Sequence, residues 1–137
     1  MTVPVKGSLT LEASLSSLPK FIGALNEALS QAGCPDKTRR EVDTAADEIL
    51  TNVADYAYPE GGGSVTMAYE ICDAVLTLEI LDSGIPFNPL KSTSPDISVV
   101  SDRGGYGILL VRRLMDKLLY ERTSDGKNKL TTVKRIL

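Results

Sequence analysis

Three polar residues of one expected helix have the types and spacing needed to bind a metal ion and an anionic ligand. Glu48 and Asn52 lie one helical turn apart in the segment DEILTNVADYAYPEGGG, and Asp55 follows closely. On a helical wheel they share with Glu41 a narrow polar stripe beside a broad apolar arc. Such a stripe lies where a helix borders a cleft, so these side chains could point into a pocket. A solvated helix face is the alternative, because most charged helical residues are simply exposed.

A second candidate site lies at the end of an expected strand, in the segment LEILDSGIPFNP. Asp82 places an acceptor-only carboxylate at the mouth of the sheet, and Gly84 removes a side chain that would keep a flat ligand away. A buried carboxylate there can accept a hydrogen bond from an exocyclic amine such as that of adenine. The sequence Asp-Ser-Gly is also a common turn, so a purely structural role stays open.

A third candidate site is the glycine cluster in DRGGYGILL, at the start of the last expected helix. Gly104, Gly105 and Gly107 would let phosphate oxygens approach the unpaired N–H groups and partial positive charge of the helix N-terminus. The cluster is not a P-loop, because no Gly-Lys-Ser/Thr sequence follows. Plain flexibility between a loop and a helix would explain the glycines equally well.

Size and charge restrict the classes of protein that fit. The chain has 137 residues, 42% hydrophobic and 24% charged, which is the composition of one globular domain over residues 1–137. The net charge of −3 provides no basic field for phosphate backbones, so no nucleic-acid partner is expected. We find neither a signal peptide nor a segment that could span a bilayer, and therefore expect a cytoplasmic protein without a membrane partner.

Histidine and cysteine usage excludes several kinds of catalysis. The chain contains no histidine, which rules out a Ser-His-Asp triad, a histidine-ligated metal and a phosphohistidine carrier. Its two cysteines, Cys34 and Cys72, lack metal-ligand spacing and are interpreted as structural thiols.

The remaining pattern predicts an α/β (α+β) fold. Apolar alternation indicates strands at 8–14, 64–71 and 74–82, and a final hairpin around Asp125-Gly126. Helical spacing covers 15–33, 35–58 and 105–119, whereas 83–103 is a long loop of the kind that is usually functional or mobile. Strands at both ends and in the middle predict a two-layer sandwich, in which a mixed, mostly antiparallel sheet carries three main helices on one face.

The order of the motifs resembles that of the histidine-kinase-like ATPase superfamily. The shared pattern is a helix with Glu-x-x-x-Asn, a strand end with Asp-x-Gly-x-Pro-Phe, a long loop and a helix start with Gly-Gly-x-Gly. The resemblance covers nearly the whole chain and includes RRLMDKLLYERTSDGKNKLTTVKRIL near its end. The segments ADEILTNVADYAY and DSGIPFNP are most similar to the corresponding segments of the anti-sigma-factor serine/threonine kinases of bacterial partner-switching systems.

This resemblance implies ATP and Mg²⁺ as cofactors, and a role for each motif. Asn52 corresponds to the Mg²⁺ ligand, Glu48 to the catalytic carboxylate that orients or deprotonates the attacking hydroxyl, and Asp82 to the residue that reads adenine. Tyr56 and Tyr106 depart from the family pattern, which commonly has histidine and a leucine-like residue there. The residues expected to contribute to the nucleotide site are Asn52, Asp55, Asp82, Gly84, Arg103, Gly104, Gly105, Tyr106, Gly107 and Thr131.

The implied activity is transfer of phosphate from ATP to a serine or threonine of a small anti-sigma-factor antagonist. The loop from Asn88 to Arg103 would act as a lid that excludes water. A sigma factor is a further expected partner, and homodimerisation is expected from the resemblance alone. Two alternatives stay open: a nucleotide-dependent binding regulator with little or no kinase activity, against which the retained Glu48 argues, and the detached catalytic domain of a histidine kinase.

Overall fold

The computed structural model describes residues 4–92 and 105–137, apart from the side chains of residues 91, 92, 105 and 106. Within these ranges the chain forms five strands, three α-helices and two short 3₁₀ helices. The elements in chain order are β1 (Val5–Glu12), η1 (Leu15–Ser17), α1 (Leu18–Gln31), α2 (Asp36–Tyr56), β2 (Ser64–Cys72), β3 (Val75–Asp82), η2 (Pro89–Ser92), α3 (Gly105–Leu114), β4 (Lys117–Arg122) and β5 (Asn128–Arg135).

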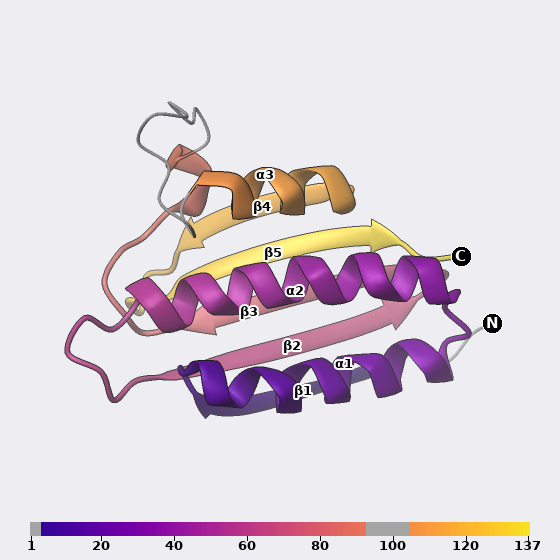
Figure 1. Ribbon diagram of the computed structural model, residues 1–137, viewed down its shortest axis with the longest axis horizontal. Helices are drawn as coiled ribbons and strands as arrows, with labels where there is room; N and C mark the ends of the chain where they lie inside the picture. The colour runs from indigo at the N-terminus through magenta and orange to yellow at the C-terminus, as the bar shows by residue number, and fades with distance from the viewer. Residues whose placement is uncertain (1–3, 93–104) are drawn as a thin grey trace.

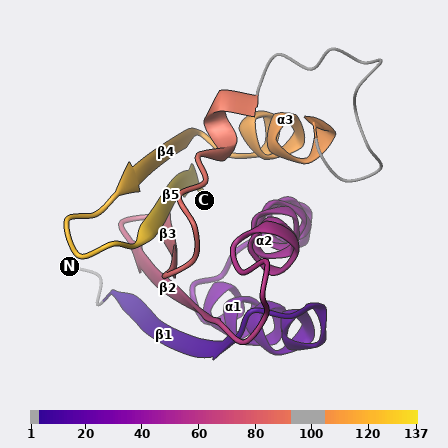
Figure 2. The same cartoon turned by 90° about the vertical axis from the view of Figure 1, so that its left-hand side faces the viewer.

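The five strands form one sheet in the order β1-β2-β3-β5-β4, and its four pairings are antiparallel. Figure 1 shows α1, α2 and α3 packed over the sheet and running roughly along its strands. Figure 2 shows that all three helices lie on the same side of the sheet. The predicted two-layer sandwich with three helices on one face is therefore confirmed. No helix in the described part of the chain is both long and apolar enough to cross a membrane.

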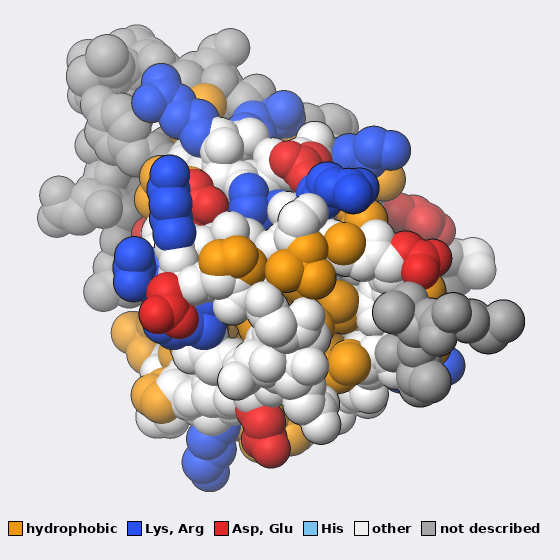
Figure 3. All heavy atoms as spheres, turned by 90° about the vertical axis from the view of Figure 1, so that its right-hand side faces the viewer, with side chains coloured by type: hydrophobic (Ala, Val, Ile, Leu, Met, Phe, Trp, Pro, Cys, Tyr) orange, Lys and Arg blue, Asp and Glu red, His pale blue; other side chains and the backbone are white. Residues whose placement is uncertain are grey.

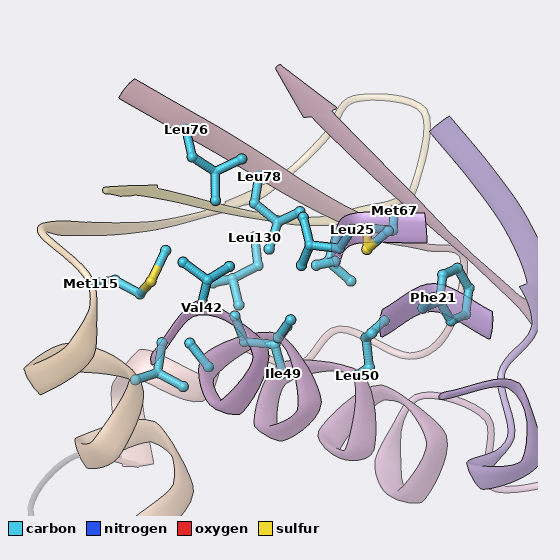
Figure 4. Packing of buried hydrophobic residues seen from close by; sticks show 14 of the residues in the cluster. Phe21, Leu25, Val42, Ile49, Leu50, Met67, Leu76, Leu78, Met115 and Leu130 are labelled. Atoms are coloured by element: carbon cyan, nitrogen blue, oxygen red, sulfur yellow. The ribbon is translucent and has the colours of Figure 1, made fainter. Parts of the chain in front are cut away.

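The core lies between the helices and the covered face of the sheet. Alternate residues of β3 point to this face, so Leu76, Leu78 and Ile80 are buried. They meet the apolar arc of α2, which includes Val42, Ile49 and Leu50, as Figure 4 shows. This packing fixes how α2 lies along the sheet, and so which of its polar residues border the remaining space.

The third helix is shorter than the sequence pattern predicts. Helical spacing extends to residue 119, but α3 ends at Leu114 and β4 begins at Lys117. The Asp116 N–H group bonds to the Val133 carbonyl oxygen (2.8 Å), which starts the pairing with β5. Leu118 continues the helical spacing of Val111 and Met115, but it also shares the covered face with Tyr120 in the alternation of a strand, so the pairing with β5 decides the conformation.

Candidate functional site

A narrow crevice separates the C-terminal half of α2 from the adjoining end of the sheet. Its cavity volume is about 30 Å³, so the crevice is narrow in this conformation. The crevice combines an apolar surface with a few polar groups, which is typical of small-molecule sites. It is lined by Ile49, Asn52, Val53 and Ala57 from α2, by Ile80, Asp82, Tyr120, Asn128 and Leu130 from the sheet, and by Phe87 and Pro89 from the segment after β3.

Asp82 occupies the sheet end of this crevice, as the sequence predicts for the end of a strand. Its side chain is buried, with 7% of the residue exposed. Oδ1 accepts two hydrogen bonds, from the Gly84 N–H group (2.9 Å) and from Nδ2 of Asn128 (2.9 Å). Among the described residues, Oδ2 has no hydrogen-bond partner. Asp82 therefore offers one acceptor oxygen for a ligand that carries an N–H donor.

Asn128 is a crevice residue that the sequence prediction missed. It lies directly opposite Asp82 in the β3–β5 pairing and is only 5% exposed. Apart from its bond to Asp82, Nδ2 donates to the Ile85 carbonyl oxygen (2.8 Å), while Oδ1 accepts from the Phe87 N–H group (3.2 Å) and the Tyr120 hydroxyl (2.5 Å). Asn128 shares its face with the buried Leu130, but the alternation in its strand is too weak to show this from the sequence alone.

Asn52 faces the crevice from α2. Only 9% of the residue is exposed, yet its side-chain amide forms no hydrogen bond with any other described residue. Its amide atoms are not fully enclosed, so water or a ligand can complete their hydrogen bonds. Its oxygen is a neutral hard donor, the type of ligand that suits Mg²⁺. Asn52 therefore fits the role of an ion ligand at the edge of this crevice.

Glu48 lies one turn before Asn52 on α2, beside the first turn of α3. A Cβ atom placed on Gly107 would lie 2.5 Å from Oε2 of Glu48, so the carboxylate fills the space that a side chain would take. Helices α2 and α3 pack side by side (Figure 1). The fold thus brings a half-buried carboxylate and the N-terminal turn of a helix together, although the two are far apart in the sequence.

Gly84 is required by the packing of the fold. A Cβ atom at this position would lie 2.1 Å from the Ala57 carbonyl oxygen, and that oxygen accepts the Ile85 N–H group at 2.9 Å. The hydroxyl of Tyr58 accepts the Ser83 N–H group at 2.8 Å. The absent side chain of Gly84 therefore permits the end of α2 to contact the end of β3, which positions Asp82.

Tyr56 stands where the family pattern commonly has histidine, and its ring stacks on Phe87. The ring centroids are 5.7 Å apart and the planes are inclined by 25°. Because Phe87 lines the crevice, this pair joins the last turn of α2 to the crevice wall.

Several other predicted site residues lie elsewhere. Thr131 alternates with the inward-facing Leu130 and lies on the uncovered face of the sheet, outside the crevice lining, so its part in the site stays a prediction. Asp55 is exposed on α2 and is not part of the crevice lining. Arg103 and Gly104 lie outside the described residues, as do most of the predicted lid and the side chain of Tyr106; Gly105 begins α3.

Charge is mixed on the end of the molecule that Figure 3 shows, where basic and acidic side chains are interspersed around an apolar area.

The fold and the crevice together define a two-layer α/β domain with a candidate small-molecule site between a helix and the sheet. The family model for the histidine kinase-like ATPase domain matches residues 11–134. The chain therefore belongs to the histidine kinase-like ATPase domain family, which confirms the resemblance found in the sequence.

Several characterised proteins resemble this chain. An anti-sigma F factor of Clostridium acetobutylicum is 30% identical over 110 residues, which cover 73% of this chain and 74% of that protein. The serine/threonine-protein kinase BtrW of Bordetella bronchiseptica is 32% identical over 90 residues, covering 63% of each chain. The serine-protein kinase RsbW of Halalkalibacterium halodurans is 25% identical over 124 residues, covering 80% of this chain and 74% of that protein.

A solved structure supports the same fold. The crystal structure of the RsbU and RsbW domains of a Mycobacterium tuberculosis protein superposes with a TM-score of 0.67 at 17% identity. The match covers 98% of this chain and 33% of that chain, so this chain spans about a third of the solved protein.

Proposed function

We propose that this chain is an ATP-dependent protein serine/threonine kinase that regulates a partner-switching system by phosphorylating a small anti-sigma-factor antagonist. The observation that carries the proposal is the position of Glu48, whose carboxylate lies against Gly107 and one turn from Asn52. A site that only bound a nucleotide would not need a carboxylate there. The names of the relatives, anti-sigma F factor and serine/threonine or serine-protein kinase, support the same activity.

The crevice would hold the adenine of ATP. Asp82 offers Oδ2 as an acceptor, and the crevice between α2 and the sheet would widen to admit the purine ring. The phosphates would then extend toward the start of α3, where backbone N–H groups favour anions, while the space beside Gly107 is taken by the carboxylate of Glu48.

Asn52 would hold Mg²⁺ through its side-chain oxygen. Its buried amide lacks a partner among residues 4–92 and 105–137, which fits this role. When bound, the ion would neutralise phosphate charge and help to orient the phosphates.

Glu48 would act on the acceptor hydroxyl. The serine or threonine oxygen forms a bond to the γ-phosphorus, the bond between that phosphorus and the bridging oxygen breaks, and the hydroxyl proton passes to the carboxylate of Glu48. The products are ADP and the phosphorylated antagonist. Such base assistance typically contributes about 10²- to 10⁴-fold to the rate, while positioning and charge neutralisation supply much of the rest.

Partner switching follows from this chemistry. Phosphorylation would release the antagonist and free the kinase to bind another target, for which a sigma factor is the expected class. We further propose that residues 1–137 act as one cytoplasmic domain and as a homodimer. The alternative, in which ATP only shapes a binding surface, is less favoured because it gives Glu48 no role.

The test is phosphate transfer from labelled ATP to antagonist proteins encoded near this chain. We expect transfer by the wild type, and a Glu48→Ala variant that still binds ATP but transfers at least about 10²-fold more slowly. Glu41→Ala is the matched control, because Glu41 is another half-buried glutamate on α2 and should be dispensable. Transfer by Glu48→Ala at the wild-type rate would refute the assigned role. Antagonist binding that depends on ATP, without any transfer, would favour the binding regulator.

A further inference from the structure

The side-chain amide of Asn128 uses all of its hydrogen-bonding capacity within the crevice wall. An asparagine side chain has two N–H donors and an oxygen with two acceptor sites. Here both donors are used, by Asp82 and the Ile85 carbonyl oxygen, and Oδ1 accepts from the Phe87 N–H group and the Tyr120 hydroxyl. The amide thus joins the end of β3, the segment after it and β4 into one unit.

This network allows only one orientation of the amide. Rotating it by 180° would place its oxygen against the carboxylate of Asp82 and the Ile85 carbonyl oxygen, and its NH₂ group against the Phe87 N–H group. Three favourable contacts would then become contacts between two acceptors or two donors. Nδ2 is therefore fixed toward Asp82, as the surrounding partners require.

The fixed amide determines which oxygen of Asp82 is left for a ligand. Oδ1 is occupied by Nδ2 of Asn128 and by the Gly84 N–H group, so the carboxylate cannot rotate without breaking both bonds. Oδ2 then remains as an acceptor, in a crevice that is also lined by Phe87 and Tyr120. Both of these residues are bonded to the same amide.

We propose that Asn128 is a positioning residue for base specificity, which acts by presenting Oδ2 of Asp82 to the exocyclic amine of adenine. The inference rests on the proposed function in that it takes an adenine nucleotide as the ligand. A base with a carbonyl group at the same ring position, as in hypoxanthine or guanine, would place an acceptor against this acceptor. A site built to receive a hydrogen bond strongly rejects an analogue that cannot supply it.

The experiment compares ADP with inosine diphosphate by calorimetry in the presence of Mg²⁺. The wild type should bind ADP at least about tenfold more tightly than inosine diphosphate. The amine of adenine donates a hydrogen bond to the charged Oδ2 of Asp82, whereas the carbonyl oxygen of hypoxanthine would face it as a second acceptor. Asn128→Asp replaces the Nδ2 donor with an acceptor at nearly constant size. Near neutral pH this variant should reduce the preference to within about threefold, because two carboxylates in contact repel each other.

Lowering the pH should partly restore the ADP preference of the Asn128→Asp variant, which provides a further test within the same protein. A proton shared between Asp82 and the new carboxylate below neutral pH would replace the lost donor and restore part of the ADP preference. Within the described part of the chain, the titratable groups next to position 128 are Tyr120 in contact with it and Arg122 opposite it in register, while α2 contributes the neutral Asn52. The wild type measured at both pH values corrects for changes in phosphate charge.

Thr132→Val is the matched control. Thr132 is another buried polar residue of β5, and its hydroxyl donates to the Lys117 carbonyl oxygen (2.8 Å), away from the crevice lining. This variant should change stability but leave the ratio of ADP to inosine diphosphate affinity unchanged. A purely structural role for Asn128 would weaken both nucleotides equally, so an unchanged ratio in Asn128→Asp overturns the inference.

A measurement on the wild type keeps the inference testable if Asn128→Asp does not fold. In ¹⁵N NMR, the Asn128 side-chain amide should exchange with solvent at least about tenfold more slowly than an exposed asparagine, since both of its protons are bonded. ADP should shift its resonance more than inosine diphosphate does. Fast exchange, or equal shifts, would contradict the inference. A wild type that binds neither nucleotide refutes the proposed function, whereas transfer activity with an unchanged base preference refutes only this inference.

Discussion

Glu48 and Gly107 are in direct contact: a Cβ atom on Gly107 would lie 2.5 Å from Oε2 of the glutamate. Glu48 belongs to the middle of α2 and Gly107 to the first turn of α3. The glycine therefore allows the carboxylate to reach the N-terminal turn of α3, where backbone N–H groups attract anions. In the proposed kinase this contact sets the distance between the catalytic carboxylate and the phosphates.

Gly107→Ala should displace the Glu48 carboxylate without unfolding the protein. The atom that the new methyl group meets is the far end of a flexible side chain, so it can rotate away. A shift of about 1 Å in a catalytic group can cost about 10²-fold in rate. We expect ATP affinity within about threefold of wild type, and phosphate transfer slowed about 10²-fold, as measured with labelled ATP.

The control for this variant is Gly23→Ala on α1. Apart from its chain neighbours and the backbone of α1, no heavy atom of the described residues lies within 4 Å of a Cβ at that exposed position. The substitution should raise the free energy of unfolding by about 0.5 to 1 kcal/mol, through helix propensity alone, and leave transfer unchanged. Equal transfer rates for Gly107→Ala and the wild type would show that the contact does not position Glu48.

Ala74→Gly should stabilise the protein, because the turn between β2 and β3 has a left-handed backbone. Asp73 and Ala74 have φ values of 52° and 68°, the pattern of a two-residue hairpin turn that favours glycine. We expect the free energy of unfolding, measured with urea, to rise by about 0.5 to 1 kcal/mol. Ala68→Gly, inside β2 of the same hairpin, should lower it by a similar amount. Destabilisation by both variants would contradict the turn geometry.

Asp43→Asn tests a pKa shift in the N-terminal half of α2. Burial raises the pKa of Asp43 above its ordinary value of 3.8, although the Asn26 amide and Arg39, whose Nη1 lies 3.4 Å from Oδ2, act in the opposite direction. The folded chain thus holds this proton more tightly than the unfolded chain. Stability from this group is fully present below pH 3.8 and falls as pH rises through the raised pKa.

The Asp43→Asn variant has no carboxyl group at this position, so it does not lose this stability as the pH rises. Its stability relative to the wild type should therefore increase between about pH 4 and about pH 7, as measured by urea unfolding of both proteins at each pH. If its relative stability decreases over this range, the ion pair with Arg39 outweighs burial and the assigned direction of the shift is wrong.

Most of the fold follows from local patterns in the sequence. The apolar arc of α2 and the alternation in β2 and β3 are strong, and Gly126, with φ of 82°, forms the predicted turn of the last hairpin. The end of α3 is different, because the residues after Leu114 fit a helix and a strand equally well. Only the pairing of β4 with β5, a long-range interaction, decides between the two.

Crevice residues could be predicted from the sequence where a single motif marks them. They were harder to predict where the register of a strand decides which face of the sheet a residue occupies. Asn52 and Asp82 could be found from their own motifs, and both line the crevice. Thr131 and Asn128 depend on which face of β5 each occupies, and the segment NKLTTV does not alternate clearly enough to show it. Asn128 faces the helices because it pairs opposite Asp82, and that places Thr131 on the other face.

The most direct test of the central claim is calorimetric titration of the full chain with ATP, with and without Mg²⁺, for the wild type and for Asn52→Ala. The account predicts saturable binding of about one ATP per chain that strengthens with Mg²⁺, and loss of this Mg²⁺ dependence in Asn52→Ala, since the amide oxygen is the proposed ligand. Failure of the wild type to take up ATP or ADP in the presence of Mg²⁺ would contradict the account, as would an unchanged Mg²⁺ dependence in Asn52→Ala.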